Sequence, residues 1–352
     1  MKEIMDKLIK EGYEAYIVGG YVRDYLLGIT SNDVDIRTNA PIDKIIEIFK
    51  DRGVAFKDYF AYHINEDDVT YTITTYRKEL SYKDNKPIKM EVAKKFSTDL
   101  MRRDFTINTF GIDKDGYLVD ILGAKKDLDS RIIRVVGDTK SKLTEDKTRI
   151  LRAIRLSCVL DFDLDPQILD FLSEYYYYLR DISDDFKKKE LDRIFDSSCY
   201  NKFFYLCNRY NLSKYLGISY DDIKDVYNRY GIWAQIDTTL PLSKKDKRII
   251  NNINKIVEKG DIELSDIDTY KDEVLYNAAS ILGITDKLRA LYDMKDIHSM
   301  FDIVIPIEVM LRYINVRNFK KTYKLIERNI MEGKIRNNKE DIEEYLKLLW
   351  VN

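Results

Sequence analysis

Two aspartates one residue apart, Asp33 and Asp35, are the residues of this sequence best placed to do chemistry. They begin a segment, Asp-Val-Asp-Ile, that reads as a β-strand, in which alternate side chains point to the same side. Both carboxylates would then project together from a rigid element. Two hard oxygen ligands in this arrangement can hold Mg²⁺, which binds carboxylates together with substrate phosphates. The pair therefore predicts a magnesium site, with both aspartates as metal ligands and catalytic residues.

A glycine pair lies shortly before the aspartates, at the end of an apolar segment. Gly19 and Gly20 let backbone amides approach a phosphate closely, and Arg23 can neutralise its charge. No Gly-Lys-Ser/Thr follows, so the glycines are not a Walker loop, and the Gly-x-Gly-x-x-Gly fingerprint is absent. Alone, a Gly-Gly pair usually marks a turn and an Asp-x-Asp pair a solvated loop or cap. Their order and short separation favour metal-dependent nucleotide transfer.

A second polar group, Asp146, Arg149, Arg152 and Arg155, repeats every three residues. We expect one long amphipathic helix over 143–160, on which residues three apart are neighbours. A carboxylate beside a guanidinium complements cytosine and adenine, which present an amino donor next to a ring-nitrogen acceptor. Uracil and guanine would instead place a carbonyl against the carboxylate. Asp146 and Arg149 are therefore predicted to read the base of CTP and ATP, and Arg152 and Arg155 to support the base or contact the triphosphate. The alternative is an ion-paired, solvent-exposed helix face.

The elements that would carry these residues change character along the chain. Up to about residue 122 we expect a mixed-sheet head of about five strands, and from about residue 125 the apolar pattern is helical. Strand-like segments cover 14–19, 33–37, 69–77 and 88–92, with β-compatible runs at 106–112 and 117–121 and a helix at 41–52. Later helices are expected over 143–160, 186–210, 218–230, 244–258, 286–296 and 306–330. The predicted fold class is α+β, with a head (1–122), a helical neck (123–200), and a helical body and tail (201–352).

Charge is balanced overall but clustered locally. The 59 Lys and Arg residues against 61 Asp and Glu residues give a net charge of −2. Residues 77–103 carry nine positive and four negative charges, and residues 310–336 carry eight and two. Such clusters can follow a phosphate backbone, although each could also be a solvated helix face. In the second cluster we expect RNA contacts from Arg317, Lys320, Lys321 and Lys324.

Three blocks occur in order along the chain: residues 16–37, residues 102–108 (Arg-Arg-Asp-Phe-Thr-Ile-Asn) and residues 145–155. They resemble motif A, the RRDFTIN block and the EDxxRxxRAxR helix of the class II tRNA nucleotidyltransferases. This family of the polymerase-β superfamily includes CCA-adding enzymes and bacterial poly(A) polymerases. The resemblance is specific over about the first 200 residues. It implies a polymerase-β-like nucleotidyltransferase head in which nucleotide is bound by Gly20, Arg23, Arg103, Asp146, Arg149, Arg152 and Arg155.

The resemblance implies addition of CCA to the tRNA 3′ end from CTP and ATP, with pyrophosphate released. Residues 78–101 lie where the family has a flexible loop tied to the switch toward ATP, which favours full CCA addition. An A-adding enzyme and a poly(A) polymerase remain alternatives. The segment Val54–Phe60 has no Gly-Arg/Lys-Arg-Phe-like sequence near it, which argues against the second. Thr72 stands where relatives often carry a glutamate, and Asp184–Phe186 departs from the neck motif, so a non-catalytic RNA-binding relative is a further alternative.

The remaining features indicate a cytoplasmic protein. The three cysteines, Cys158, Cys199 and Cys207, are odd in number and lack metal-site spacing, which favours reduced thiols. The charged first residues do not resemble a signal peptide, and no stretch reaches the length of a membrane span. Of the two histidines, His63 is expected to be a strand residue rather than a general base.

Overall fold

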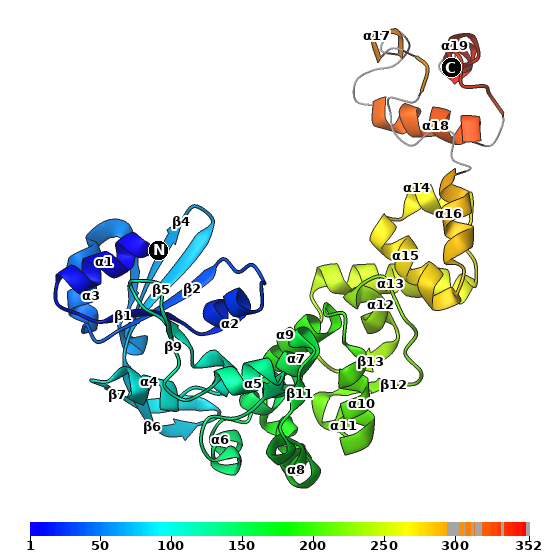
Figure 1. Cartoon of the computed structure of the whole chain (residues 1–352). Coiled ribbons are helices and arrows are strands. Elements are labelled where there is room, and N and C mark those ends of the chain that lie inside the picture. Colours follow the sequence, from blue (N-terminus) through cyan, green and yellow to red (C-terminus); the bar gives the residue numbers. More distant parts are fainter. Residues whose placement is uncertain (294–302, 306, 311–312, 314–318, 332–333, 350–352) are drawn as a thin grey trace. The chain divides into compact units, whose positions relative to one another are not determined.

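The computed structural model divides the protein into two compact units (Figure 1). The first comprises Met1–Asp221 and Ile236–Leu242, and the second Asp222–Gln235 and Ser243–Asn352. The domain boundaries expected near residues 122 and 200 both fall inside the first unit and stay predictions. The structure describes residues 1–293, 303–305, 307–310, 313, 319–331 and 334–349.

A seven-stranded mixed sheet forms the N-terminal part of the first unit, in the order β3-β4-β5-β2-β1-β8-β9. β2 pairs in parallel with β5 and antiparallel with β1, and the other pairs are antiparallel. The strands at 14–19, 33–37 and 69–77 are confirmed, and His63 is a strand residue as expected. The bounds are β1 (Ala15–Val18), β2 (Asp33–Thr38), β3 (Val54–Phe56), β4 (Ala61–Glu66), β5 (Val69–Thr75), β8 (Gly111–Ile112) and β9 (Leu118–Val119).

The alternation of apolar and polar residues along β2 decides which face each side chain takes. Val34, Ile36 and Thr38 are buried, while the polar residues between them lie on the opposite face. Helices α1 (Lys2–Lys10) and α3 (Ile42–Phe49) pack against each other and against the sheet, and Figure 1 shows them together on one side. The opposite face of β2, which carries its polar residues, can therefore hold a catalytic site.

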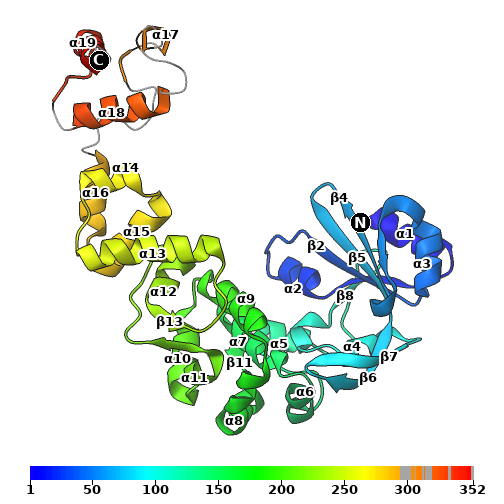
Figure 2. The same ribbon diagram turned by 180° about the vertical axis from the view of Figure 1, so that it is seen from behind.

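A β-hairpin and a helix occupy the segment 78–101, which lies where the resemblance places a flexible loop of the family. Strands β6 (Arg77–Lys83) and β7 (Lys86–Val92) pair outside the main sheet, and helix α4 (Phe96–Met101) follows. Figure 2, the view from behind, shows the hairpin next to α4. At the turn Asp84 and Asn85 have φ of 50° and 63°, the left-handed backbone of a two-residue hairpin turn. The strand expected over 88–92 is confirmed as part of β7, and the role of this segment in the switch toward ATP stays a prediction.

The helix expected over 143–160 is two helices, α6 (Thr139–Glu145) and α7 (Thr148–Leu160). Asp146 has the extended conformation (φ −137°, ψ 96°), and its Oδ1 accepts hydrogen bonds from the Thr148 backbone N–H and hydroxyl, at 3.0 and 2.5 Å. Asn85, at the hairpin turn, accepts a hydrogen bond from the Lys147 backbone N–H at 2.9 Å. A side chain from a hairpin distant in the sequence thus accepts a hydrogen bond from the backbone where the helix is interrupted.

Three further expectations were wrong in detail. Residues 106–112 begin with a 3₁₀ turn, η3 (Thr106–Asn108), before β8, and the helix expected over 186–210 is interrupted between α9 and α10. The expected helix 218–230 begins instead with strand β12, which pairs with β13. The remaining helices of this unit are α2 (Gly20–Leu26), α5 (Lys125–Asp129), α8 (Pro166–Tyr175), α9 (Asp184–Phe195), α10 (Asn201–Tyr210) and α11 (Ser213–Leu216). Its short strands are β10 (Ile132–Ile133), β11 (Asp163–Leu164), β12 (Ile218–Tyr220) and β13 (Ile236–Thr238).

The described part of the second unit is helical, as expected. Two buried apolar clusters stabilise this part, one centred on α13 and α15 and one on α18 and α19. None of the helices in the described ranges has the length and apolar content needed to cross a bilayer. The helices are α12 (Arg229–Ala234), α13 (Lys244–Lys259), α14 (Leu264–Thr269), α15 (Asp272–Leu282), α16 (Thr285–Asp293), α17 (Ile307–Met310), α18 (Phe319–Met331) and α19 (Lys339–Leu349).

Candidate active site

A cavity of about 350 Å³ in the first unit collects most of the residues singled out in the sequence. Its walls come from the β1–α2 turn, strand β2, the β6–β7 hairpin, the segment after α4, and the start of α7. Asp33, Arg23 and Arg155 are not among the described residues that line this cavity. Six of the predicted site residues line the cavity: Gly20, Asp35, Arg103, Asp146, Arg149 and Arg152.

The two aspartates lie on the polar face of β2, as the alternation predicted. Asp33 is exposed and Asp35 is half-buried. Partial burial raises the pKa of Asp33, and the charge of Asp35 raises it further. Like charges held this close disfavour ionisation, and a bound cation would relieve the repulsion.

Among the residues that the structure describes, no third carboxylate forms a metal-binding group with this pair. Thr72 of β5 lies opposite Asp35 in the sheet. Within the described ranges, no group of three or more His, Cys, Asp or Glu residues could hold a metal ion. Two protein carboxylates fit a magnesium ion that takes its other ligands from phosphates and water.

Gly19 lies between Asp35 and an arginine of the RRDFTIN block. A Cβ built on Gly19 would be 3.2 Å from Asp35 Oδ2 and 3.2 Å from Arg103 Nη1, and its φ is +78°. A side chain at this position would be strained and would crowd both groups. Gly20 begins α2, and a Cβ there would meet only the Arg23 guanidinium, with Nη2 nearest at 3.5 Å.

Arg23 does not line the cavity but contacts Asn108, which does. Its guanidinium donates to Asp24 Oδ1 at 2.6 and 2.8 Å and to Asn108 Oδ1 at 2.7 Å. Asn108 lines the cavity and donates to Asp104 Oδ1 at 3.1 Å. Arg23 thus orients Asn108.

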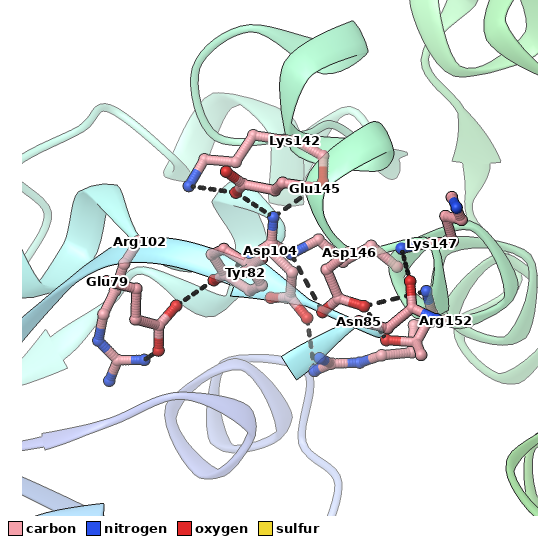
Figure 3. Close-up of polar contacts among 12 residues, drawn as sticks. Glu79, Tyr82, Asn85, Arg102, Asp104, Lys142, Glu145, Asp146, Lys147 and Arg152 are labelled. Atoms are coloured by element: carbon pink, nitrogen blue, oxygen red, sulfur yellow. Dashed lines mark hydrogen bonds and ion pairs between the residues drawn. The ribbon is translucent and has the colours of Figure 1, made fainter. Parts of the chain in front are cut away.

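Asp104 orients an arginine. Its Oδ2 lies 2.5 Å from Arg152 Nη2, an ion pair drawn in Figure 3. Burial alone would raise the pKa of Asp104, but Arg152 and the hydrogen bonds from Asn108 and the Phe105 N–H lower it. Arg155 turns away from this pair and donates to Glu190 Oε2 of α9 at 2.6 Å.

The two residues predicted to read the base are adjacent. Arg149 Nε lies 3.7 Å from Asp146 Oδ2. Arg149 is only 3% exposed, and its Nη1 donates to the Lys142 carbonyl at 2.9 Å and to Glu145 Oε1 at 2.6 Å. The guanidinium is therefore held on several sides. Asp146, Arg152 and Asp104, all labelled in Figure 3, line the same cavity.

Sequence reasoning missed the hairpin residue that contacts Arg149. Tyr82 accepts a hydrogen bond from Arg149 Nη2 at 2.9 Å, and the guanidinium lies 5.4 Å from the centre of its ring. Tyr82 donates to Glu79 in turn (Figure 3). The signal available was the turn at Asp84 and Asn85, which would have placed Tyr82 on a hairpin.

Arg37 was also missed. It follows Asp33 and Asp35 at the next alternate position of β2 and lines the cavity. Burial lowers its pKa to about 9, with Arg103 and Arg102 adding to the effect and Asp99 opposing it. The strand alternation could have identified this position.

The candidate RNA-binding residues lie outside this cavity, in the second unit. Lys321 and Lys324 are exposed on α18, on the side opposite the buried Thr322 and Ile326. Lys320 belongs to the same helix, and Arg317 lies outside the described residues.

Comparisons with known proteins found a similar domain and similar whole chains. Residues 15–134 match the poly A polymerase head domain. A CCA-adding enzyme of Bacillus pumilus is 27% identical over 97% of this chain and 95% of its own length. One from Lactococcus lactis is 37% identical over 52% of this chain and 47% of its own.

Solved structures share the fold. The Bacillus stearothermophilus CCA-adding enzyme in complex with CTP has a TM-score of 0.67 at 22% identity, covering 99% of this chain and 96% of that one. The Thermotoga maritima CCA-adding enzyme complexed with tRNA has a TM-score of 0.65 at 19% identity, over 99% and 94%. The predicted fold class, a mixed-sheet head followed by helices, is confirmed.

The fold and the match to the head domain define a nucleotidyltransferase. The proteins that the chain resembles along almost its whole length include CCA-adding enzymes, which supports a relationship to the class II tRNA nucleotidyltransferases. This similarity suggests use of a divalent metal.

Proposed function

We propose that this protein is a CCA-adding tRNA nucleotidyltransferase, which completes the tRNA 3′ end from CTP and ATP without a nucleic-acid template. The RNA 3′-hydroxyl oxygen forms a bond to the α-phosphorus, and the bond to pyrophosphate breaks. The observation that carries the proposal is one cavity lined both by the carboxylate of Asp35 and by the Asp146–Arg149 pair. Similarity to CCA-adding enzymes over 97% of the chain supports it.

Asp33 and Asp35 would hold the metal, for which we propose Mg²⁺. A bound divalent cation offsets the charge that develops on the attacking and leaving oxygens. The two aspartates fix its place on β2, directly beside Gly19 and Arg103. These neighbours would keep the triphosphate within reach of the RNA end, and positioning of this kind supplies much of the catalysis in such sites.

The triphosphate would be contacted by Arg103 and Arg152, with close backbone approach at Gly20. Arg152 is held by Asp104 at 2.5 Å, so its orientation does not depend on the nucleotide. Arg23 acts through Asn108, and Arg155 through the packing of α7 on α9. We assign these last two arginines positioning roles.

Base choice would follow from the hydrogen-bond pattern of the Asp146–Arg149 pair. Asp146 accepts from the amino group of cytosine or adenine, and Arg149 donates to the adjacent ring nitrogen. Asp146 Oδ1 is tied to Thr148, and Oδ2 lies beside Arg149. Uracil and guanine would leave buried polar groups unpaired, which is the strongest basis for rejecting an analogue.

The RNA would be held in part by the exposed lysines of α18, through shape and phosphate contacts. We propose a cytoplasmic location because free tRNA 3′ ends are the substrate. The alternatives from the sequence, an A-adding enzyme and a poly(A) polymerase, differ in which nucleotide and which RNA they accept.

A primer-and-nucleotide matrix tests the proposal. Four tRNAs, ending without CCA, without CA, without A, or complete, are incubated with CTP alone, ATP alone or both. A CCA-adding enzyme extends the first two with CTP, the third with ATP, and leaves the complete tRNA unchanged. An A-adding enzyme ignores CTP, and a poly(A) polymerase extends unrelated RNA with many adenylates. A protein that binds tRNA and extends none of them is the non-catalytic relative.

A further inference from the structure

Beside the metal-bearing strand, positive charge exceeds negative charge in a buried cluster. Four guanidinium groups surround two carboxylates, and all but one of the six residues line the same cavity. The exception is Asp99, which is fully buried behind it. The cluster consists of Arg37, Arg77, Arg102 and Arg103 with Asp99 and Glu79.

Two of the four arginines are hydrogen-bonded within the cluster. Arg102 donates to Asp99 Oδ1 at 2.9 Å and to Glu79 Oε1 at 3.1 Å. Arg77 donates to the Tyr59 carbonyl at 2.7 Å and to Glu79 Oε1 at 3.3 Å. Each keeps one buried nitrogen without a partner, Nη2 of Arg102 and Nε of Arg77. Their bonds occupy Glu79 and one oxygen of Asp99.

Only one carboxylate oxygen of the cluster remains for the other two arginines, Arg37 and Arg103. Asp99 Oδ2 lies 3.5 Å from Arg103 Nη2 and 4.0 Å from Arg37 Nε, and it forms a hydrogen bond with neither. Buried atoms Nε and Nη1 of Arg37 and Nε and Nη2 of Arg103 have no hydrogen-bond partner. Unpaired buried guanidinium N–H groups are costly, so this part of the cluster is incomplete without an anion.

The position of Arg37 indicates which anion completes it. On β2 it follows Asp35 by two residues on the same face, a separation of about 7 Å along the strand. Its neighbour Arg103 extends Nη1 to the Gly19 turn, beside Asp35. An anion lying between the aspartates and Arg37 therefore belongs to a group attached to, or leaving from, the phosphate at the metal.

We propose that Arg37 binds the pyrophosphoryl group, both as the β- and γ-phosphates of the incoming nucleotide and as the pyrophosphate product. This inference rests on the proposed nucleotidyl transfer and adds a residue and a ligand to it. Guanidinium N–H groups match phosphate oxygens in geometry and charge. Arg37 thus has unpaired N–H groups and surplus positive charge in the free protein. The pyrophosphoryl group supplies both the hydrogen-bond acceptors and the neutralising charge.

Binding measurements with three ligands test the role of Arg37. Calorimetric titration with Mg²⁺ present compares pyrophosphate, CTP and CMP on the wild type and on Arg37→Gln. We expect the variant to bind pyrophosphate and CTP about tenfold more weakly, the loss typical of a charged hydrogen bond to phosphate. CMP, which has no pyrophosphoryl group, should bind both proteins equally, and Arg37→Lys should restore part of the affinity.

Thermal unfolding of the free proteins separates binding from a structural role. Arg37 forms no hydrogen bond in the cluster and lies 4.0 Å from Asp99, so Arg37→Gln should lower the unfolding temperature only slightly. The matched control is Arg102→Gln, which removes two bonded contacts and should unfold at a lower temperature. Addition of pyrophosphate should raise the unfolding temperature of the wild type more than that of Arg37→Gln.

Unchanged pyrophosphate affinity in Arg37→Gln overturns the inference, as does an equal loss of affinity for CMP. So does a fall in unfolding temperature matching that of Arg102→Gln. The primer-and-nucleotide matrix is scored separately on the wild type. If the wild type completes CCA while Arg37→Gln keeps its pyrophosphate affinity, the inference fails and the proposed function stands. If pyrophosphate binding depends on Arg37 but no nucleotide is incorporated, the proposed function fails and the binding site stands.

Discussion

The guanidinium of Arg149 donates a 2.9 Å hydrogen bond to the hydroxyl of Tyr82 and lies over its ring, although 67 residues separate them in the sequence. Tyr82 belongs to the β6–β7 hairpin, and Arg149 to the first turn of α7, directly after the break at Asp146. A movement of the hairpin would therefore move or release the guanidinium.

Replacing Tyr82 by phenylalanine should weaken base discrimination. The ring remains, but Arg149 loses one of the bonds that fix it. We expect the ratio of kcat/KM for CTP over UTP to fall about tenfold, the usual cost of one hydrogen bond to a charged group. Single-nucleotide incorporation measures it. Tyr117→Phe, at an exposed position, is the control, and equal ratios in both variants would contradict the positioning role.

Removing the base-reading pair itself should relax selectivity further. Asp146→Ala with Arg149→Ala takes away both the acceptor and the donor that complement cytosine and adenine. We expect incorporation of UTP or GTP to approach that of CTP, since a discrimination of about 10⁴–10⁵ can rest on such polar groups. Retained selectivity at reduced rate would show that other residues read the base.

Asp33→Ala should stop incorporation and leave tRNA binding largely intact. The variant loses one of two carboxylate ligands, whereas the exposed lysines of α18 are untouched. We expect the rate to fall by more than about 100-fold, because loss of residues that merely support a metal ligand already costs about 10–100-fold. Filter binding of labelled tRNA supplies the second readout. Turnover at the wild-type rate would refute the metal assignment.

Asp99 should make stability depend on acidic pH. Burial alone raises its pKa, but Arg37, Arg102 and Arg103 lower it below the ordinary value. A carboxyl whose pKa is lowered by folding contributes stability above its unfolded pKa and loses it as pH falls through the folded one. Asp99→Asn should lower the unfolding free energy by about 3–5 kcal/mol at pH 7, as for a broken buried ion pair.

Denaturant unfolding at several pH values checks this dependence. The difference between wild type and Asp99→Asn should shrink below about pH 4, where the unfolded carboxyl becomes protonated. The control is Asp129→Asn, which breaks an exposed pair with Lys125 and should change stability by less than about 1 kcal/mol. A constant difference across the pH range would mean that the charge of Asp99 is not what stabilises the cluster.

Charge reversal on α18 should weaken tRNA binding in a salt-dependent way. Lys321→Glu with Lys324→Glu removes two exposed cations from the helix. We expect the slope of log affinity against log salt to fall by about 1 for each phosphate that the variant no longer binds. The same reversal at Lys245, exposed on α13, is the control. An unchanged slope would remove this helix from the RNA-binding surface.

The placement of Asp33 and Asp35 on one face of a strand could be predicted because the property that decides it is local. Asp33 and Asp35 share a face through the period of a strand, which the apolar residues between them already indicate. The break in the helix expected over 143–160 could not be predicted, because it depends on a contact between residues far apart in the sequence. Residues 143–160 have a continuous helical pattern, and the break at Asp146 is completed by Asn85 on the hairpin. No local signal indicates that contact.

The sequence by itself determined the chemistry of this protein: the order and spacing of glycines, carboxylates and arginines, and the two strand and helix periods that carry them. Only the tertiary structure decided which charges meet. It brings Tyr82 to Arg149, Asp104 to Arg152, and four arginines to two carboxylates beside the metal strand. Hydrogen bonds and burial act over a few ångströms between residues far apart in the chain, so partners, surplus charge and the cavity they line exist only once the chain has folded.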